Sequence, residues 1–196
     1  MTLTPDASKR AEISEQSHAQ NRQLHKWLTT DPQRLSALKH VASLSLPQGM
    51  IAAGFVRNLV WDRLHSSQYQ LNDVDVIYFD SNDTRRCTEQ AYFARLVELE
   101  PNLPWSVKNQ ARMHLRNGDK PYQSAIDAMC YWPEKETAVA ARWINNQIEV
   151  IAPFGIQRLF ELHLTPNPAR DNALFHERLT SKSWLSRYPK LQIKSR

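Results

Sequence analysis

The feature that most constrains the fold is the run at residues 73–80, which reads Asp-Val-Asp-Val-Ile-Tyr-Phe-Asp. Val, Ile, Tyr and Phe favour extended structure, so the run predicts a β-strand. Residues two apart in a strand point to the same face, which puts Asp73 and Asp75 side by side at its start. Two adjacent carboxylates repel each other unless a cation lies between them. Such oxygen ligands suit Mg²⁺, which proteins commonly hold with one or two carboxylates and substrate phosphates.

An isolated Asp-x-Asp is more often a pair of solvated acids, so the neighbouring sequence matters. Gly54-Phe-Val-Arg57 lies upstream, where a short apolar strand ends and a helix with apolar spacing begins. A glycine there lets a phosphate approach the helix N-terminus, whose backbone N–H groups favour anions. Arg57, one turn into the helix, can bind a phosphate through its guanidinium. The alternatives are a plain turn at Gly54 and a surface arginine at position 57.

Composition and charge fit one domain rather than several. The chain has 196 residues, of which 41% are hydrophobic, and this is enough to bury a sizeable core. A net charge of +5 fits a nucleotide or nucleic-acid ligand without requiring one. Two distant cysteines exclude a zinc motif and a disulfide framework. The longest apolar run, at residues 50–56, is too short to cross a bilayer, and the N-terminus lacks a signal-peptide pattern. We expect a cytoplasmic protein without membrane contact.

The order of predicted elements indicates an α/β (α+β) fold. We expect a flexible segment at residues 1–10 and a single domain at 11–196 with a helical segment at about 155–196. Asp31 and Pro32 predict a helix start, and Asn145-Asn146 predicts a two-residue hairpin turn. A second strand is expected from Trp105 to Asn109, running on towards Leu115. Four side chains would then share one of its faces, namely Lys108, Gln110, Arg112 and His114.

The order Gly54-x-x-Arg57 followed by Asp73-x-Asp75 resembles the signature of polymerase-β-like nucleotidyltransferases, which include the tRNA CCA-adding enzymes. The sequence is most similar to a bacterial nucleotidyltransferase-like family over residues 35–191. Further matching segments are 53–62, 73–80, 107–114, 137–142 and 151–155, with Phe175, Arg178, Lys182 and Trp184. The resemblance implies a polymerase-β-like palm with a small mixed sheet flanked by helices, plus N- and C-terminal helices.

The resemblance also implies roles for particular residues. Asp73 and Asp75 would be the catalytic residues and the ligands of Mg²⁺ or Mn²⁺. Gly54 and Arg57 would hold the triphosphate. Independently of the resemblance, the dense polar cluster on the second predicted strand adds Lys108, Asn109 and Arg112 as nucleotide-binding candidates, and the alternative for this cluster is a solvated strand edge. The superfamily usually carries a third carboxylate on the neighbouring strand, where this chain has Lys108 or Asn109. Four other acids are candidate substitutes, none of them singled out by its spacing: Asp80, Asp127, Glu134 and Glu149.

These observations predict a Mg²⁺-dependent nucleotidyltransferase that moves a nucleoside monophosphate from an NTP to a hydroxyl. The acceptor is not identified by the sequence, and both an RNA and a small molecule fit. The alternative is a catalytically inactive module on the same fold that binds nucleotides or RNA. The missing third carboxylate is the feature that favours this alternative.

Overall fold

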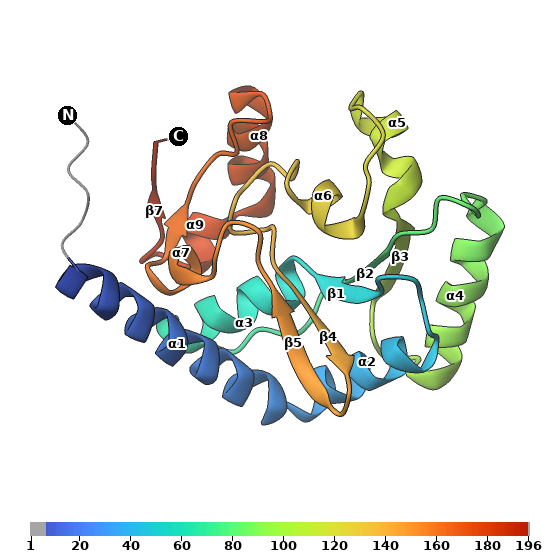
Figure 1. Ribbon diagram of the computed structural model, residues 1–196, viewed down its shortest axis with the longest axis horizontal. Helices are drawn as coiled ribbons and strands as arrows, with labels where there is room; N and C mark the ends of the chain where they lie inside the picture. Colours follow the sequence, from blue (N-terminus) through green and yellow to red (C-terminus); the bar gives the residue numbers. More distant parts are fainter. Residues whose placement is uncertain (1–6, 196) are drawn as a thin grey trace.

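The computed structural model describes residues 7–195, and a five-stranded mixed sheet lies at its centre (Figure 1). The strand order is β3-β2-β1-β4-β5. β2 and β3 run parallel, and the other neighbours are antiparallel. The strands are β1 (Met50–Ala52), β2 (Val74–Tyr78), β3 (Trp105–Asn109), β4 (Ala140–Ile144) and β5 (Gln147–Ile151). This architecture confirms the predicted mixed α/β fold with a small sheet flanked by helices.

Helices cover both faces of the sheet (Figure 1). On one side are α1 (Ala7–Thr29), α2 (Pro32–Ser43), α3 (Gly54–His65) and α4 (Arg86–Leu99). Beyond the other side are α5 (Met113–Asn117), α6 (Ala125–Met129) and α8 (Asn172–Lys182). The chain also contains α7 (Gln157–Phe160), α9 (Trp184–Arg187) and a parallel pair, β6 (His163–Leu164) with β7 (Gln192–Ile193). None of the helices within residues 7–195 is both long and apolar enough to span a membrane.

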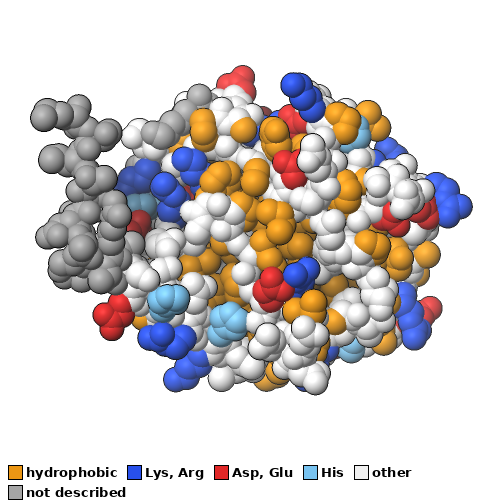
Figure 2. All heavy atoms as spheres, in the orientation of Figure 1, with side chains coloured by type: hydrophobic (Ala, Val, Ile, Leu, Met, Phe, Trp, Pro, Cys, Tyr) orange, Lys and Arg blue, Asp and Glu red, His pale blue; other side chains and the backbone are white. Residues whose placement is uncertain are grey.

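The sheet divides two apolar clusters, and β2 contributes to both. Val74 and Val76 join the larger cluster with α1, α2 and α3. Ile77 faces the smaller cluster, which includes Met50 of β1 and Met129 of α6. On the face drawn in Figure 2, hydrophobic side chains gather in the middle and most charged side chains lie towards the margin. The alternation along β2 is what turns Asp73 and Asp75 away from the larger cluster.

Local signals in the sequence set several boundaries. The Asp31 carboxylate accepts a hydrogen bond from the Arg34 backbone N–H at 3.0 Å, and Pro32 is the first residue of α2. Asn145 and Asn146 have φ angles of 50° and 60°, and they join β4 to β5 as expected. α1 begins at Ala7, so the segment expected to be loose is helical from there. Residues 1–6 lie outside the described residues.

The expected continuation of β3 towards Leu115 is wrong. The strand ends at Asn109, whose side-chain oxygen accepts the Ala111 backbone N–H at 3.0 Å and starts a 3₁₀ turn over Gln110–Arg112. α5 follows directly. The helical segment expected at about 155–196 is not continuous, and Ser183, with a φ of +52°, separates α8 from α9 within it. The β6–β7 pair has no counterpart among the predicted elements.

Candidate active site

The Asp pair faces a cavity of about 880 Å³. Asp73 directly precedes β2 and is exposed, whereas Asp75 lies within the strand and is partly buried. Ala52 at the end of β1 pairs with Asp75, so the start of α3 emerges next to the carboxylates. Gly54 and Arg57 line the same cavity. Two features that the sequence predicts to act together therefore share one cavity.

The electrostatic environment of the Asp pair favours a bound cation. The pKa of Asp75 is raised to about 6, mainly by burial and also by the charge of Asp73, while Arg57 and Lys182 act in the opposite sense. Burial also raises the pKa of Asp73. In the described part of the chain, no group of three or more His, Cys, Asp or Glu side chains could hold a metal ion. Two carboxylates with substrate phosphates nevertheless fit Mg²⁺ or Mn²⁺.

The turn from β1 into α3 has an unusual backbone. Ala53 has φ +56° and ψ −120°, a region that costs a non-glycine residue free energy and occurs often at functional sites. Its N–H donates to the Val139 carbonyl at 2.8 Å, which fixes the turn against the segment before β4. At Gly54 a Cβ atom would lie 3.2 Å from the side-chain nitrogen of Asn58. The missing side chain keeps this helix N-terminus open to an anion.

Arg57 is held in place by aromatic rings and hydrogen bonds. Its guanidinium carbon lies 5.0 Å from the Trp61 ring centre and 4.6 Å from that of Trp184. The guanidinium donates to the Thr137 hydroxyl at 2.6 Å. Burial lowers the pKa of Arg57 to about 10, and Glu134 opposes this effect, so the side chain still carries its charge at neutral pH. Arg57 is therefore a fixed positive charge at the wall of the cavity.

The C-terminal helices contribute positively charged side chains to one wall of the cavity, which we call the cationic wall. No binding role was predicted for them from the sequence. Arg178 and Lys182 of α8 line the cavity, and the Lys182 charge lowers the pKa of both Asp73 and Asp75. Arg178 donates to the buried carboxylate of Glu134 at 2.5 Å. Leu174, Arg178 and Lys182 are spaced by four residues, and this spacing is a signal that could have identified one helix face. Phe175 and Trp184, which carry part of the family resemblance, are both buried and pack these helices onto the core.

The register of β2 and β3 identifies what replaces a third carboxylate. Asp75 is paired with Ser106 and Ile77 with Lys108, so the serine and the lysine share the face of the Asp pair. The Ser106 hydroxyl hydrogen-bonds to Asp75. Lys108 lines the cavity, and its contact with a nucleotide stays a prediction. No acid of β3 occupies this face.

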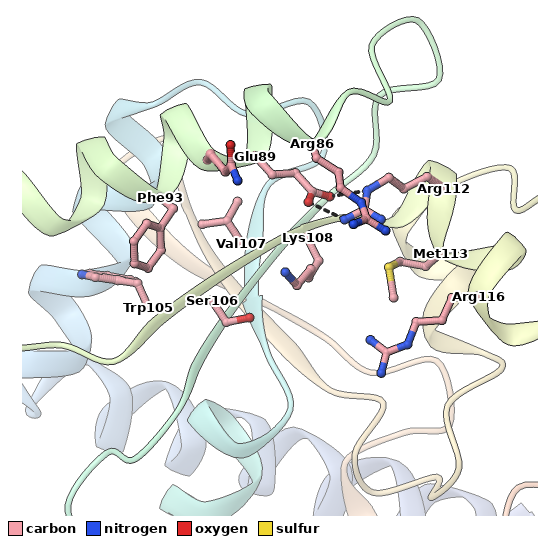
Figure 3. A pocket seen from close by; sticks show the side chains of 11 residues that line it. Arg86, Glu89, Phe93, Trp105, Ser106, Val107, Lys108, Arg112, Met113 and Arg116 are labelled. Carbon is pink, nitrogen blue, oxygen red and sulfur yellow. Dashed lines mark hydrogen bonds and ion pairs between the residues drawn. The ribbon is translucent and has the colours of Figure 1, made fainter.

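Asn109 and Arg112 do not line the Asp cavity, which corrects their placement in the predicted site. Asn109 is fully buried, and its amide donates to the carbonyls of Asp80 and Asp83 at 2.7 and 2.9 Å. Arg112 donates to Glu89 at 2.8 Å and lines a neighbouring hollow (Figure 3). Strand spacing failed for Arg112 because β3 ends at Asn109, whereas Asn109 lies on the other face of the strand from Lys108.

The four acids considered as replacements also lie elsewhere. Asp80 accepts backbone N–H groups of its own loop. The Asp127 carboxylate accepts the Gln123 backbone N–H at the start of α6, where Ser124 is the N-cap. Glu149 pairs with Arg142 across the β4–β5 hairpin. Glu134 is close to Arg57 but fully buried against Arg178 and Thr137. None of the four lines the Asp cavity.

Solved structures of known proteins share this architecture. An NMR structure described as a CCA-adding enzyme head domain has a TM-score of 0.80 at 28% identity, covering 89% of this chain and 96% of that one. A CCA-adding enzyme in complex with CTP has a TM-score of 0.53 at 15% identity, covering 86% of this chain and 42% of that one. The second likeness concerns the fold alone. The fold is that of a CCA-adding enzyme head domain, in the polymerase-β-like nucleotidyltransferase superfamily.

A protein-family model described as nucleotidyltransferase matches residues 39–193. The chain belongs to this nucleotidyltransferase family. No curated protein matches the sequence. The family assignment and the fold agree with the resemblance that the Gly-x-x-Arg and Asp-x-Asp motifs carry.

Proposed function

We propose that the protein is a nucleotidyltransferase that uses Mg²⁺ or Mn²⁺ to transfer a nucleoside monophosphate from an NTP to a hydroxyl acceptor. The observation that carries this proposal is the meeting of the Asp pair, the Gly54 helix start and a cationic wall in one cavity. Two acids line that cavity against seven cationic side chains. The cations are Arg57, Lys108, Arg116, Arg170, Arg178, Lys182 and Arg187. Arg170 and Arg178 pair with Asp119 and Glu134 outside the lining, and the other five cations still exceed the two acids, which suits a triphosphate.

Each element of the cavity has a task in phosphoryl-type transfer. Asp73 and Asp75 would hold the metal ion, which when bound neutralises phosphate charge and orients the triphosphate. Backbone N–H groups at the start of α3 bind phosphate oxygens, and Gly54 leaves them room. Arg57 and Lys182 stabilise the negative charge that develops on the leaving group. Catalysis of this kind depends mainly on positioning and electrostatics.

The transfer step needs no reactant other than the NTP and the acceptor. The acceptor hydroxyl oxygen forms a bond to the α-phosphorus, and the bond from that phosphorus to the bridging oxygen breaks. Pyrophosphate leaves with the electron pair, and the hydroxyl proton passes to solvent water. Ser106 and Lys108 stand where a third carboxylate would accept that proton, so we expect slower turnover than with an acid at that position.

The second candidate is an inactive nucleotide-binding or RNA-binding module. The presence of Ser106 and Lys108 in place of a third carboxylate favours it. Its cavity would still bind Mg²⁺ and NTP, because that requires the Asp pair and the cationic wall but no general base. The two candidates therefore differ in turnover rather than in nucleotide binding.

Calorimetry with Mg²⁺ and a non-hydrolysable NTP tests the nucleotide site. We expect the Asp73→Asn/Asp75→Asn double variant to bind at least about tenfold more weakly than the wild type, because it loses both metal ligands. Glu177→Gln, which changes an exposed acid of α8 outside the cavity, is the matched control and should bind like the wild type. Undiminished binding by the double variant would contradict the proposed site.

A transfer assay separates the two candidates. The protein is incubated with Mg²⁺, NTPs labelled at the α-phosphate and total cellular RNA or a metabolite extract. Label that becomes attached to an acceptor supports the enzyme. Nucleotide binding without label transfer supports the inactive module.

A further inference from the structure

A second hollow, of about 630 Å³, lies beside the Asp cavity between α4 and β3 (Figure 3). We call it the side groove. Lys108, Met113 and Arg116 line both spaces, so the side groove opens directly beside the Asp cavity. Ser106 also lines it, and the Ser106 hydroxyl bonds to Asp75. A molecule lying in the side groove could therefore extend its end to the catalytic pair.

The side groove carries surplus positive charge. Its acid is Glu89, which is buried and accepts hydrogen bonds from Arg112 and from the Asn109 backbone N–H at 2.7 Å. The other cations of its lining are Arg86, Lys108 and Arg116, and none of these forms an ion pair with any side chain in the range 14–195. Cations without a partner along a groove attract the phosphates of a polyanion.

Aromatic surface lies at one end of the side groove. Phe93 of α4 is 43% exposed, and Figure 3 shows its ring beside that of Trp105. Exposing a phenylalanine to water is unfavourable, and a flat ligand stacked on the ring would cover it. Cationic grooves with aromatic platforms are how proteins bind single-stranded nucleic acids, since phosphates contact the cations and bases stack on the rings.

The geometry of the proposed reaction also places the acceptor hydroxyl on the side of the side groove. In phosphoryl transfer the attacking and leaving oxygens lie roughly in line through the phosphorus. The triphosphate would lie towards Gly54 and Arg57, which follow β1, and Asp75 is on β2. The attacking hydroxyl must then approach from the opposite side, where β3 and the side groove lie.

We infer that the side groove binds the acceptor and that the acceptor is a single-stranded polynucleotide ending in a free hydroxyl. The role of the side groove as an acceptor site rests on the proposed transfer reaction, but binding of the polynucleotide to the groove needs neither Mg²⁺ nor NTP. The polynucleotide backbone contacts Arg86, Lys108 and Arg116, and a base stacks on Phe93. The terminal hydroxyl reaches the Asp pair past Ser106.

Fluorescence anisotropy with labelled single strands tests this inference. The full chain is titrated against an RNA and a DNA of about 12 nucleotides and the same mixed sequence, without Mg²⁺ or NTP. The test variant is Arg86→Ala/Phe93→Ala, in which both changed side chains are exposed, so the fold is retained. Arg95→Ala is the control, because Arg95 lies on the same helix, pairs with Glu98 and does not line the side groove.

We expect the double variant to bind at least about tenfold more weakly than the wild type, and Arg95→Ala to bind within about twofold of it. Binding of RNA, of DNA or of both supports the inference and identifies the sugar. Equal affinities in all three proteins, or preference for a poly-glutamate peptide over both strands, would overturn it. Since nucleotide calorimetry tests the Asp cavity separately, a failure of one proposal is distinguishable from a failure of the other.

Discussion

Replacing Asp75 by asparagine should stabilise the metal-free protein at neutral pH while abolishing its metal site. The wild type holds the Asp75 carboxylate partly buried beside Asp73, and both effects disfavour its charged form. The pKa is raised from its ordinary value of 3.8 to about 6. The folded state therefore binds more protons than the unfolded state between these values, and stability falls as the pH rises through this window.

The size of the effect follows from that pKa. Each pH unit between the two values is worth about 1.4 kcal/mol, so the full penalty above pH 6 is about 3 kcal/mol. Asp75 keeps part of its surface in solvent, which screens the interaction, and we expect a gain of about 1–3 kcal/mol for Asp75→Asn at about pH 8. At about pH 4 the wild-type carboxyl is protonated in the folded state, and the gain should be close to zero.

Urea unfolding in the presence of EDTA, at about pH 8 and about pH 4, measures both values. Glu177→Gln is the control and should change the unfolding free energy by less than about 0.5 kcal/mol at either pH. Adding Mg²⁺ and a non-hydrolysable NTP should stabilise the wild type and leave Asp75→Asn unchanged. If Asp75→Asn were less stable than the wild type at the higher pH, the Asp pair would not be an electrostatically strained site.

Two further predictions concern the walls of the cavity. Asp119→Asn should lower stability by about 2–3 kcal/mol at neutral pH, because the Arg170 guanidinium donates to Asp119 at 2.5 and 2.6 Å and lowers its pKa. A lowered carboxyl pKa stabilises the fold above 3.8, so this deficit should shrink below that pH in denaturant titrations. Trp184→Ala should cost about 3–5 kcal/mol of unfolding free energy and weaken NTP binding, because Trp184 is buried against Trp61 and Arg57. Trp184→Phe should retain most of the unfolding free energy and most of the NTP affinity in the same assays. Equal losses in the two variants would contradict the idea that an aromatic ring is needed at this position.

Elements specified by local chemistry could be predicted from the sequence. Asp31 with Pro32 specifies the start of α2, and Asn145 with Asn146 specifies the turn of the β4–β5 hairpin. The side of the sheet that Asp75 faces could also be predicted from the alternation of side chains along β2, because Val74 and Val76 on the opposite face are buried in the core. In each case neighbouring residues alone determine the conformation.

Features that depend on distant contacts could not be predicted. The alternation of Lys108, Gln110 and Arg112 is typical of a strand, but the Asn109 side-chain oxygen accepts the Ala111 N–H and starts a turn there. Distant contacts hold that side chain in place, because its oxygen also accepts the Asp80 N–H and its amide donates to the Asp83 carbonyl. Helical spacing could group Arg178 with Lys182, but their position opposite the Asp pair requires the whole C-terminal segment to fold back. Spacing within one element carries no information about which element will face it.

The dependence of the cavity on α8 and α9 has a consequence for biosynthesis. The Asp pair leaves the ribosome about 100 residues before Arg178 and Lys182 do, and translation adds roughly 5–20 residues per second. During those seconds the nascent chain carries its two carboxylates without Arg178, Lys182 and Arg187, which are three of the seven cations that line the completed cavity. The cavity would thus be completed late in translation, and a chain interrupted before α8 should bind a triphosphate more weakly than the full chain.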